Sequence, residues 1–80
     1  MSRLRAGPVK RSVTIAGHET SVTLEPIFWD GLTQAARRLD LPLNALIARI
    51  DAERIEAANP PNLASAIRVW LYVRARAFVS

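Results

Sequence analysis

The chain has 80 residues, of which 50% are apolar, contains no cysteine and carries a formal net charge of +4. The lack of cysteine excludes disulfide bonds and thiolate metal sites. No apolar run approaches the ~20 residues of a membrane helix. At this length the stability that a single core supplies is marginal. The apolar half of the residues is also more than a small monomer buries well. We therefore expect a soluble, cytoplasmic protein that forms an oligomer with a core shared between copies.

Charge is concentrated at the two ends of the chain. Residues 1–11 contain four basic residues and residues 63–80 contain three, with no acid in either segment. Residues 12–62 hold four arginines against seven acids. Basic ends favour a polyanionic partner, although this net charge is also ordinary for a soluble protein. Residues 1–8 are non-periodic and predict a disordered arm, and residues 9–80 predict a single domain.

Two alternating stretches predict a β-hairpin. Apolar and polar residues alternate over residues 9–15 and again over residues 20–24, as in half-buried strands. Gly17 suits the first central position of a type II′ turn, so we expect Gly17-His18 to form a two-residue loop. In that register Val13 faces Val22. One face then holds Val13, Val22 and Leu24, and the other holds Ser12, Thr14, Ser21 and Thr23.

Three helices are expected after the hairpin. Pro26 stands where a first helical turn tolerates proline, and apolar residues recur at helical steps as far as Leu39. Pro42 separates this helix from a second one over residues 43–57. Asn62 can cap a third helix over residues 63–79. This last helix is apolar around most of its circumference, so we expect it to pack against the rest of the dimer or against a partner.

Catalytic and cofactor motifs are missing from the sequence. There is no glycine-rich phosphate loop, and His18 has no second histidine with which to form a metal site. The carboxylates of Asp40, Asp51 and Glu53 fall on an expected loop and a polar helix face, where nothing pairs them for acid–base chemistry. One small core also leaves no room for a substrate cavity. We expect no enzyme activity, no cofactor and no metal.

The junction between the second strand and the first helix resembles a known family. The segments that carry the likeness are Thr20-Ser-Val-Thr-Leu24, Glu25-Pro-Ile-Phe-Trp-Asp-Gly-Leu32 and Leu41-Pro-Leu-Asn-Ala-Leu-Ile47. In this order they resemble the ribbon-helix-helix domain of small bacterial DNA-binding proteins. Upstream, Lys10-Arg-Ser12 and Gly17-His18 are similar to stand-alone members that carry an additional N-terminal segment.

The resemblance implies a mainly α-helical, intertwined homodimer. The strand before the first helix would pair antiparallel with its twin, with an additional N-terminal strand completing a hairpin and a third helix at the C-terminus. The residues expected in the dimer core are Val22, Leu24, Phe28, Trp29, Leu32, Leu46, Ile47 and Ile50.

The same resemblance implies that the paired ribbon lies in the DNA major groove. The hydroxyls of Ser21 and Thr23 would bond to base edges, and the amide of Asn44, at a helix N-terminus, would bond to a phosphate. The residues expected at the DNA are Lys10, Arg11, Glu19, Ser21, Thr23 and Asn44.

Three residues and the expected width of the sheet depart from the family pattern. Glu19 and Asp40 place carboxylates near the expected phosphates, and Pro42 stands where a hydroxyl cap is usual. A four-stranded dimer sheet would also be about 15 Å wide, against a groove of ~12 Å.

The leading function is sequence-specific DNA binding by a small transcriptional regulator. The alternative is a homodimeric protein-interaction module of the same fold that binds no DNA. It would recognise a protein through the third helix or the polar sheet face, and changes at Tyr72 or Arg76 would weaken that binding.

Overall fold

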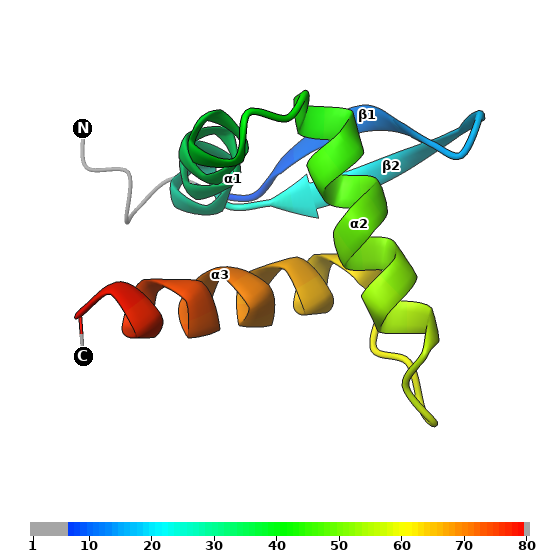
Figure 1. Ribbon diagram of the computed structural model, residues 1–80. Coiled ribbons are helices and arrows are strands. Elements are labelled where there is room, and N and C mark those ends of the chain that lie inside the picture. The colour runs from blue at the N-terminus through cyan, green and yellow to red at the C-terminus, as the bar shows by residue number, and fades with distance from the viewer. Residues whose placement is uncertain (1–6, 80) are drawn as a thin grey trace.

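The computed structural model describes residues 7–79, which form a two-stranded sheet with three helices (Figure 1). The strands are β1 (Val9–Ile15) and β2 (His18–Leu24), and the helices are α1 (Pro26–Leu39), α2 (Leu43–Ile55) and α3 (Leu63–Val79). α2 packs on β1 and α3 on β2, while α1 packs against α2 and α3. The element order is as predicted, and α2 ends two residues earlier than expected. Of the expected arm, residues 1–6 lie outside the described residues.

The hairpin is present, but its register differs from the predicted one. Ile15 pairs with His18, so the loop is Ala16-Gly17 rather than Gly17-His18. Both loop residues have positive φ, 51° and 82°, as in the type I′ turn that suits twisted strands. The observed ladder pairs seven residues of each strand, whereas the predicted register pairs five. We attribute the shift to these additional pairs, which offset the strain of a left-handed alanine.

The shift leaves the two faces of the hairpin as predicted. Moving one strand by two residues returns every side chain to the same face, because the side-chain period of a strand is two. Val13, Val22 and Leu24 are at most 4% exposed beneath the helices. The hydroxyl-bearing face, opposite them, is exposed.

The turn between α1 and α2 is closed by backbone hydrogen bonds. Asp40 takes a left-handed conformation with φ of 56°, where glycine is usual. Its N–H donates to the carbonyl of Arg37 at 3.1 Å, and the N–H of Leu41 donates to the carbonyl of Ala36 at 2.9 Å. This pair of bonds is the Schellman motif, so α1 ends in a defined geometry without a glycine.

One contiguous core lies between the sheet and the helices. Ile67 of α3 is fully buried, and the indole N–H of Trp29 donates to the carbonyl of Val9 at 2.9 Å, which ties α1 to β1. A single copy therefore encloses these residues, and their burial does not require the shared core expected from composition. The core residues are Val13, Val22, Leu24, Trp29, Leu32, Ala35, Ala36, Leu46, Ile47, Ile50 and Ile67.

α3 is covered on one side only. Val69, Tyr72 and Val73 are 60–63% exposed, although they lie on the same helix as the buried Ile67. Within residues 7–79, no helix combines the length and the apolarity that crossing a bilayer would demand.

Asn62 caps α3, as predicted. Its side-chain oxygen accepts a hydrogen bond from the N–H of Ser65 at 2.8 Å. Replacing Asn62 by alanine leaves this N–H without its partner, so we expect a loss of about 1 kcal/mol in the free energy of unfolding. Urea unfolding of Asn62→Ala measures the loss, and Asn59→Ala in the same exposed loop is the control. Equal stability of the two variants would contradict a capping role.

Candidate nucleic-acid interface

The outward face of the hairpin carries six polar side chains, all of them exposed. The ladder places them in three facing pairs, with Ser12 opposite Ser21 at the centre. A hydroxyl both donates and accepts hydrogen bonds, so a row of serines and threonines can bond to the edge of any base. The six residues, which we call the polar face, are Lys10, Ser12, Thr14, Glu19, Ser21 and Thr23.

The polar face includes two residues that were not among the predicted DNA contacts. Ser12 and Thr14 lie on β1 but face the same side as Ser21 and Thr23. The alternation of β1 had already placed them on that side. The family resemblance implied base contacts from β2 alone and only phosphate contacts from β1, so these two hydroxyls were not among the predicted residues.

One edge of β2 is available for pairing. Ile15 and His18 are the outer residues of a two-residue turn, so they form a hydrogen-bonded pair. Hydrogen-bonded and non-hydrogen-bonded pairs alternate along an antiparallel ladder. Counting from this pair, Ser21 and Thr23 fall in non-hydrogen-bonded pairs, so their backbone N–H and C=O groups point away from β1. The sheet described over residues 7–79 has β1 and β2 as its only strands. A second strand can therefore add along Ser21 and Thr23.

Arg11 is not part of the polar face. It lies on the opposite side of β1, in the same register as Val22, and its guanidinium stacks 5.0 Å from the ring centre of the buried Trp29. The side chain stays exposed at the flank of the hairpin. Lys10 and Arg11 are thus neighbours in sequence that present their charges on different sides of the strand.

The N-terminus of α2 is open to an anion. Pro42 is its N-cap and supplies no side-chain hydrogen bond, and Asn44 is exposed in the first turn. The first N–H groups of a helix attract anions through the helix dipole. α2 begins beside β1 (Figure 1), but no hydrogen bond joins Asn44 to the polar face within the described residues.

The residues predicted for the dimer core are together in the interior of one copy. Seven of them are buried, and the eighth, Phe28, is half-buried with the Arg68 guanidinium 5.8 Å from its ring centre. Val22 and Leu24 belong to the hairpin, and the other six lie on α1 and α2 in the same core cluster, so the hairpin packs on these helices through its inward face. Whether they also contact a second copy stays a prediction.

An ion pair joins the start of α1 to α3. The guanidinium of Arg68 donates to both carboxylate oxygens of Glu25, at 2.9 and 3.3 Å, and about a third of each side chain stays exposed. Glu25 directly follows β2, and Arg68 lies 43 residues further along the chain. These hydrogen bonds hold the pKa of the Glu25 carboxyl below its ordinary value, and the Arg68 charge acts in the same direction.

This lowered pKa predicts a pH-dependent contribution to stability. An acid whose pKa is lower in the folded state stabilises the fold above its unfolded pKa and loses that contribution as the pH falls through the folded value. We expect Glu25→Gln to reduce the free energy of unfolding at neutral pH. The difference from the parent protein should close in the acid range below pH 4.5. Urea titrations of both proteins at neutral and acid pH test this, and a difference that does not change with pH would contradict it.

The charge of the polar face is balanced, with Lys10 and Glu19 as its only ionic residues. Over residues 7–79, no three acidic or histidine side chains gather closely enough to hold a metal ion. The chemistry that this surface offers is therefore hydrogen bonding by hydroxyls.

A comparison with protein families identifies the domain. The family model described as Ribbon-helix-helix domain matches residues 8–75, which is most of the chain. No curated protein and no solved structure matches the chain in the corresponding searches. Domains of this kind are typical of DNA-binding transcription regulators and not of enzymes. The match spans the hairpin, α1, α2 and most of α3, and the chain belongs to the ribbon-helix-helix domain family.

Proposed function

We propose that this protein is a small bacterial transcriptional regulator that binds specific DNA sequences through the polar face of its hairpin. The observation that supports this most is the asymmetry of β2. Its inward Val22 and Leu24 are buried, whereas Ser21 and Thr23 are exposed on the other side. A strand that packs on the core through one face and exposes hydroxyls on the other can contact bases without a disorder-to-order transition. Such a regulator would act in the cytoplasm, where the DNA is.

A homodimer would bring two polar faces together. Its two β2 strands would pair antiparallel along their available edges, giving the strand order β1, β2, β2, β1. A two-stranded ribbon spans ~5 Å and fits the ~12 Å major groove, but four strands do not. The central β2 pair would therefore lie in the groove, and each β1 must curl away toward the sugar–phosphate walls.

Phosphate contacts would come from the periphery of this sheet. Lys10 lies on the outer strand, and Arg11 is held at the flank by its stacking on Trp29. The backbone amide of Asn44 would add a contact at the open end of α2. Three such contacts in each copy give six in the dimer.

A salt titration tests this proposal. Four of these contacts, those of Lys10 and Arg11 in the two copies, neutralise a phosphate, whereas the amide of Asn44 is neutral. The logarithm of the binding constant should therefore fall with the logarithm of salt concentration with a slope of about −4. The purified protein is titrated against a random duplex pool at two salt concentrations. Saturable binding with a steep slope is the expected result. No saturable binding at low salt would contradict the proposal and favour the protein-interaction alternative.

Glu19 should weaken DNA binding without being needed for the fold. It is exposed on the polar face opposite Thr14, and its charge repels phosphates. We expect Glu19→Gln to raise the affinity for non-cognate duplex about threefold to tenfold at low salt, because two carboxylates are neutralised in a dimer. Glu56→Gln, an exposed carboxylate at the end of α2, is the control and should change nothing. A decrease in affinity for Glu19→Gln would instead assign this carboxylate to a base contact.

A further inference from the structure

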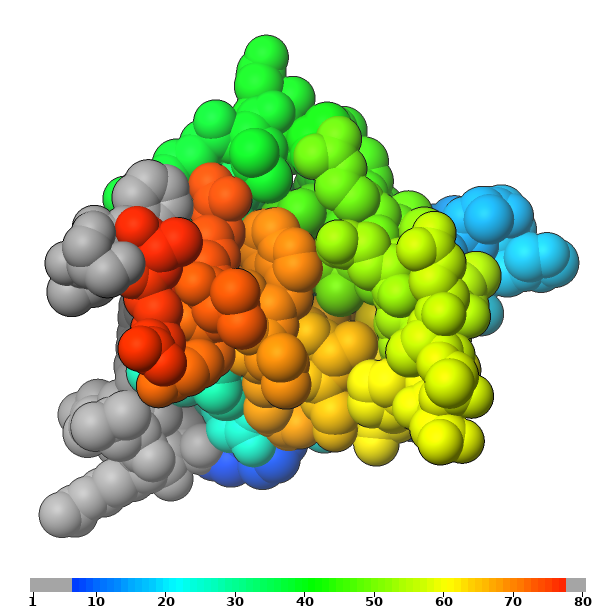
Figure 2. All heavy atoms as spheres, turned by 60° about the horizontal axis from the view of Figure 1, so that its bottom comes forward, coloured from blue at the N-terminus to red at the C-terminus, as the bar shows by residue number. Residues whose placement is uncertain are grey.

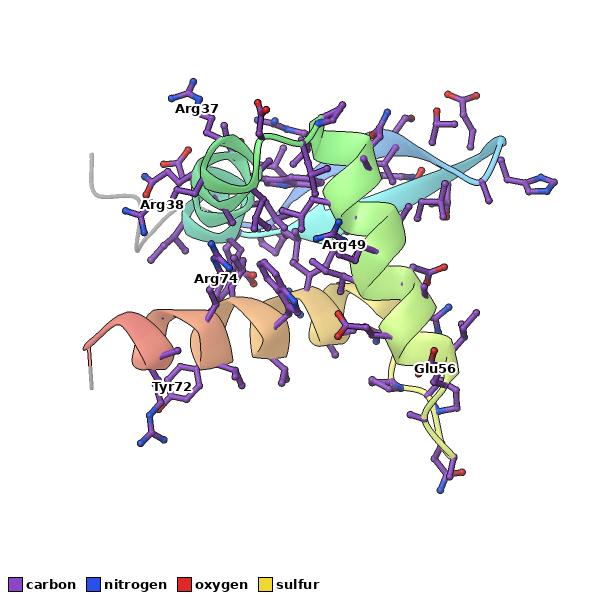
Figure 3. All side chains as sticks on the ribbon, viewed as in Figure 1. Arg37, Arg38, Arg49, Glu56, Tyr72 and Arg74 are labelled. Atoms are coloured by element: carbon purple, nitrogen blue, oxygen red, sulfur yellow. The ribbon has the colours of Figure 1, made fainter. Side chains whose placement is uncertain are left out.

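The uncovered side of α3 forms a stripe that we call the α3 outer face, made of Val69, Tyr72, Val73 and Arg76. These residues are spaced at helical steps on one side of the helix, and the first three are 60–63% exposed. Figure 3 shows Tyr72 pointing away from the rest of the molecule, and the Arg76 guanidinium lies 5.9 Å from its ring centre. The stripe therefore presents an aromatic side chain next to a positive charge.

A groove runs beside this stripe, between α2 and α3. It has a volume of about 610 Å³. Glu53 lies on its α2 side and makes no ion pair with any residue that the structure describes, whereas the nearby Arg54 is paired with Asp51 at 2.8 Å. Figure 2 shows this side of α3 uncovered, with the end of α2 alongside. The apolar residues that line the groove include Ile50, Ala57, Ala66, Val69, Trp70 and Val73.

We propose that the α3 outer face binds the same face of a second copy, with the two α3 helices antiparallel. Tyr72 of each copy enters the groove of the other, so the contact is two-fold symmetric and closes on itself. An antiparallel arrangement brings the basic end of one α3 to the end of the partner's α3 that adjoins α2. Arg76 of one copy then lies next to Glu53 of the other, and opposite charges meet at both ends of the contact. We infer a second copy as the partner because one chain carries both halves of the contact. It has the projecting Tyr72 and the groove that would receive it, and it has both Arg76 and Glu53.

The contact is expected to be weak. The surface that one stripe of four residues and its groove can bury is smaller than the ~800 Å² that each partner buries in a standard stable interface. Assembly through α3 should therefore depend on concentration. It uses the side of α3 that faces away from β2, so it is independent of DNA binding and of pairing between β2 strands.

Sedimentation velocity over a concentration series tests this assembly. We expect the mass of the parent protein to rise with concentration, and Val73→Glu to weaken that association about tenfold or more, because it places a charge at the centre of the apolar contact. Ala52→Glu is the control, since Ala52 is exposed on α2 and does not line the groove. Far-ultraviolet circular dichroism confirms that each variant is folded.

A charge exchange tests the antiparallel arrangement. Arg76→Glu and Glu53→Arg should each weaken association, and the double variant should restore most of it. Thr23→Pro distinguishes association through α3 from pairing through β2. It removes an N–H at the edge of β2 but leaves the α3 outer face intact. In that variant the sensitivity to Val73→Glu should persist. Identical mass curves for the parent protein and Val73→Glu, or no rescue in the double variant, would overturn the proposal.

Discussion

Replacing Ser21 and Thr23 together by alanine is expected to remove most of the sequence preference in DNA binding while leaving the fold unchanged. Both side chains are exposed, so the core does not need them. Each hydrogen bond to a base contributes about 1 kcal/mol, and a dimer presents four such hydroxyls, so affinity for the preferred duplex should fall roughly 100- to 1,000-fold. Binding to a scrambled duplex should change little, because phosphate contacts supply it.

Ser12→Ala combined with Thr14→Ala is the matched control. These hydroxyls lie on the same face but on the outer strand, which cannot reach the groove floor at the same time as β2. We expect less than about a tenfold change for this variant, the effect of a single lost contact of about 1 kcal/mol. Competition titrations with preferred and scrambled duplexes measure both variants. An equal loss on both duplexes for the Ser21 and Thr23 variant would show that these residues do not select bases.

Among the variants proposed for this protein, Ile67→Ala is expected to have the largest effect on stability. This residue is fully buried, and it belongs to the core cluster that joins α3 to the sheet and the other helices. Ile67→Ala leaves a cavity and should cost about 2–5 kcal/mol. A domain of this length has a total stability of only about 4–12 kcal/mol, so the variant should be close to unfolding at 37 °C.

Val69→Ala on the same helix is the control for this experiment. Val69 is 62% exposed, so its truncation should change the free energy of unfolding by less than about 0.5 kcal/mol. Urea unfolding followed by tryptophan fluorescence reports both variants, because Trp29 is in the core and Trp70 packs against it. Equal losses at Ile67 and Val69 would mean that α3 does not dock on the sheet as the structure has it.

The elements of the fold could be predicted because their signals are local. Pro26 and Asn62 mark helix starts where the structure has them, and the alternation of both strands assigned each side chain to its correct face. The register could not be predicted from the same alternation, because a shift of two residues preserves both faces. Choosing between the registers requires the left-handed conformation of Ala16, a residue that normally avoids it.

The position of α3 was beyond sequence reasoning. Its apolar character predicted that it would be covered, but whether by its own chain or by a second copy depends on tertiary packing. In the structure Ile67 points inward and Tyr72 outward, so one side of α3 is covered by its own chain and the other side is not. The ion pair of Glu25 with Arg68 had no sequence signal, because 43 residues separate its members.

The polar face was predicted in part, because strand alternation identified the exposed hydroxyls. Which of them contact bases depends on pairing between copies. Asp40 was expected to place a carboxylate near the phosphate site, and the structure shows that it also closes α1 in a left-handed conformation. Its negative charge near the N-terminus of α2 should weaken the phosphate contact proposed for the amide of Asn44.

The most direct test of DNA binding by the polar face is amide chemical-shift mapping of the protein during titration with duplex DNA. DNA binding by the polar face predicts that the largest shifts fall on Ser21, Thr23 and Lys10, with smaller shifts at Asn44, and that the amides of Val69 to Val73 on α3 stay unchanged. Shifts concentrated on α3, with none along β2, would contradict it.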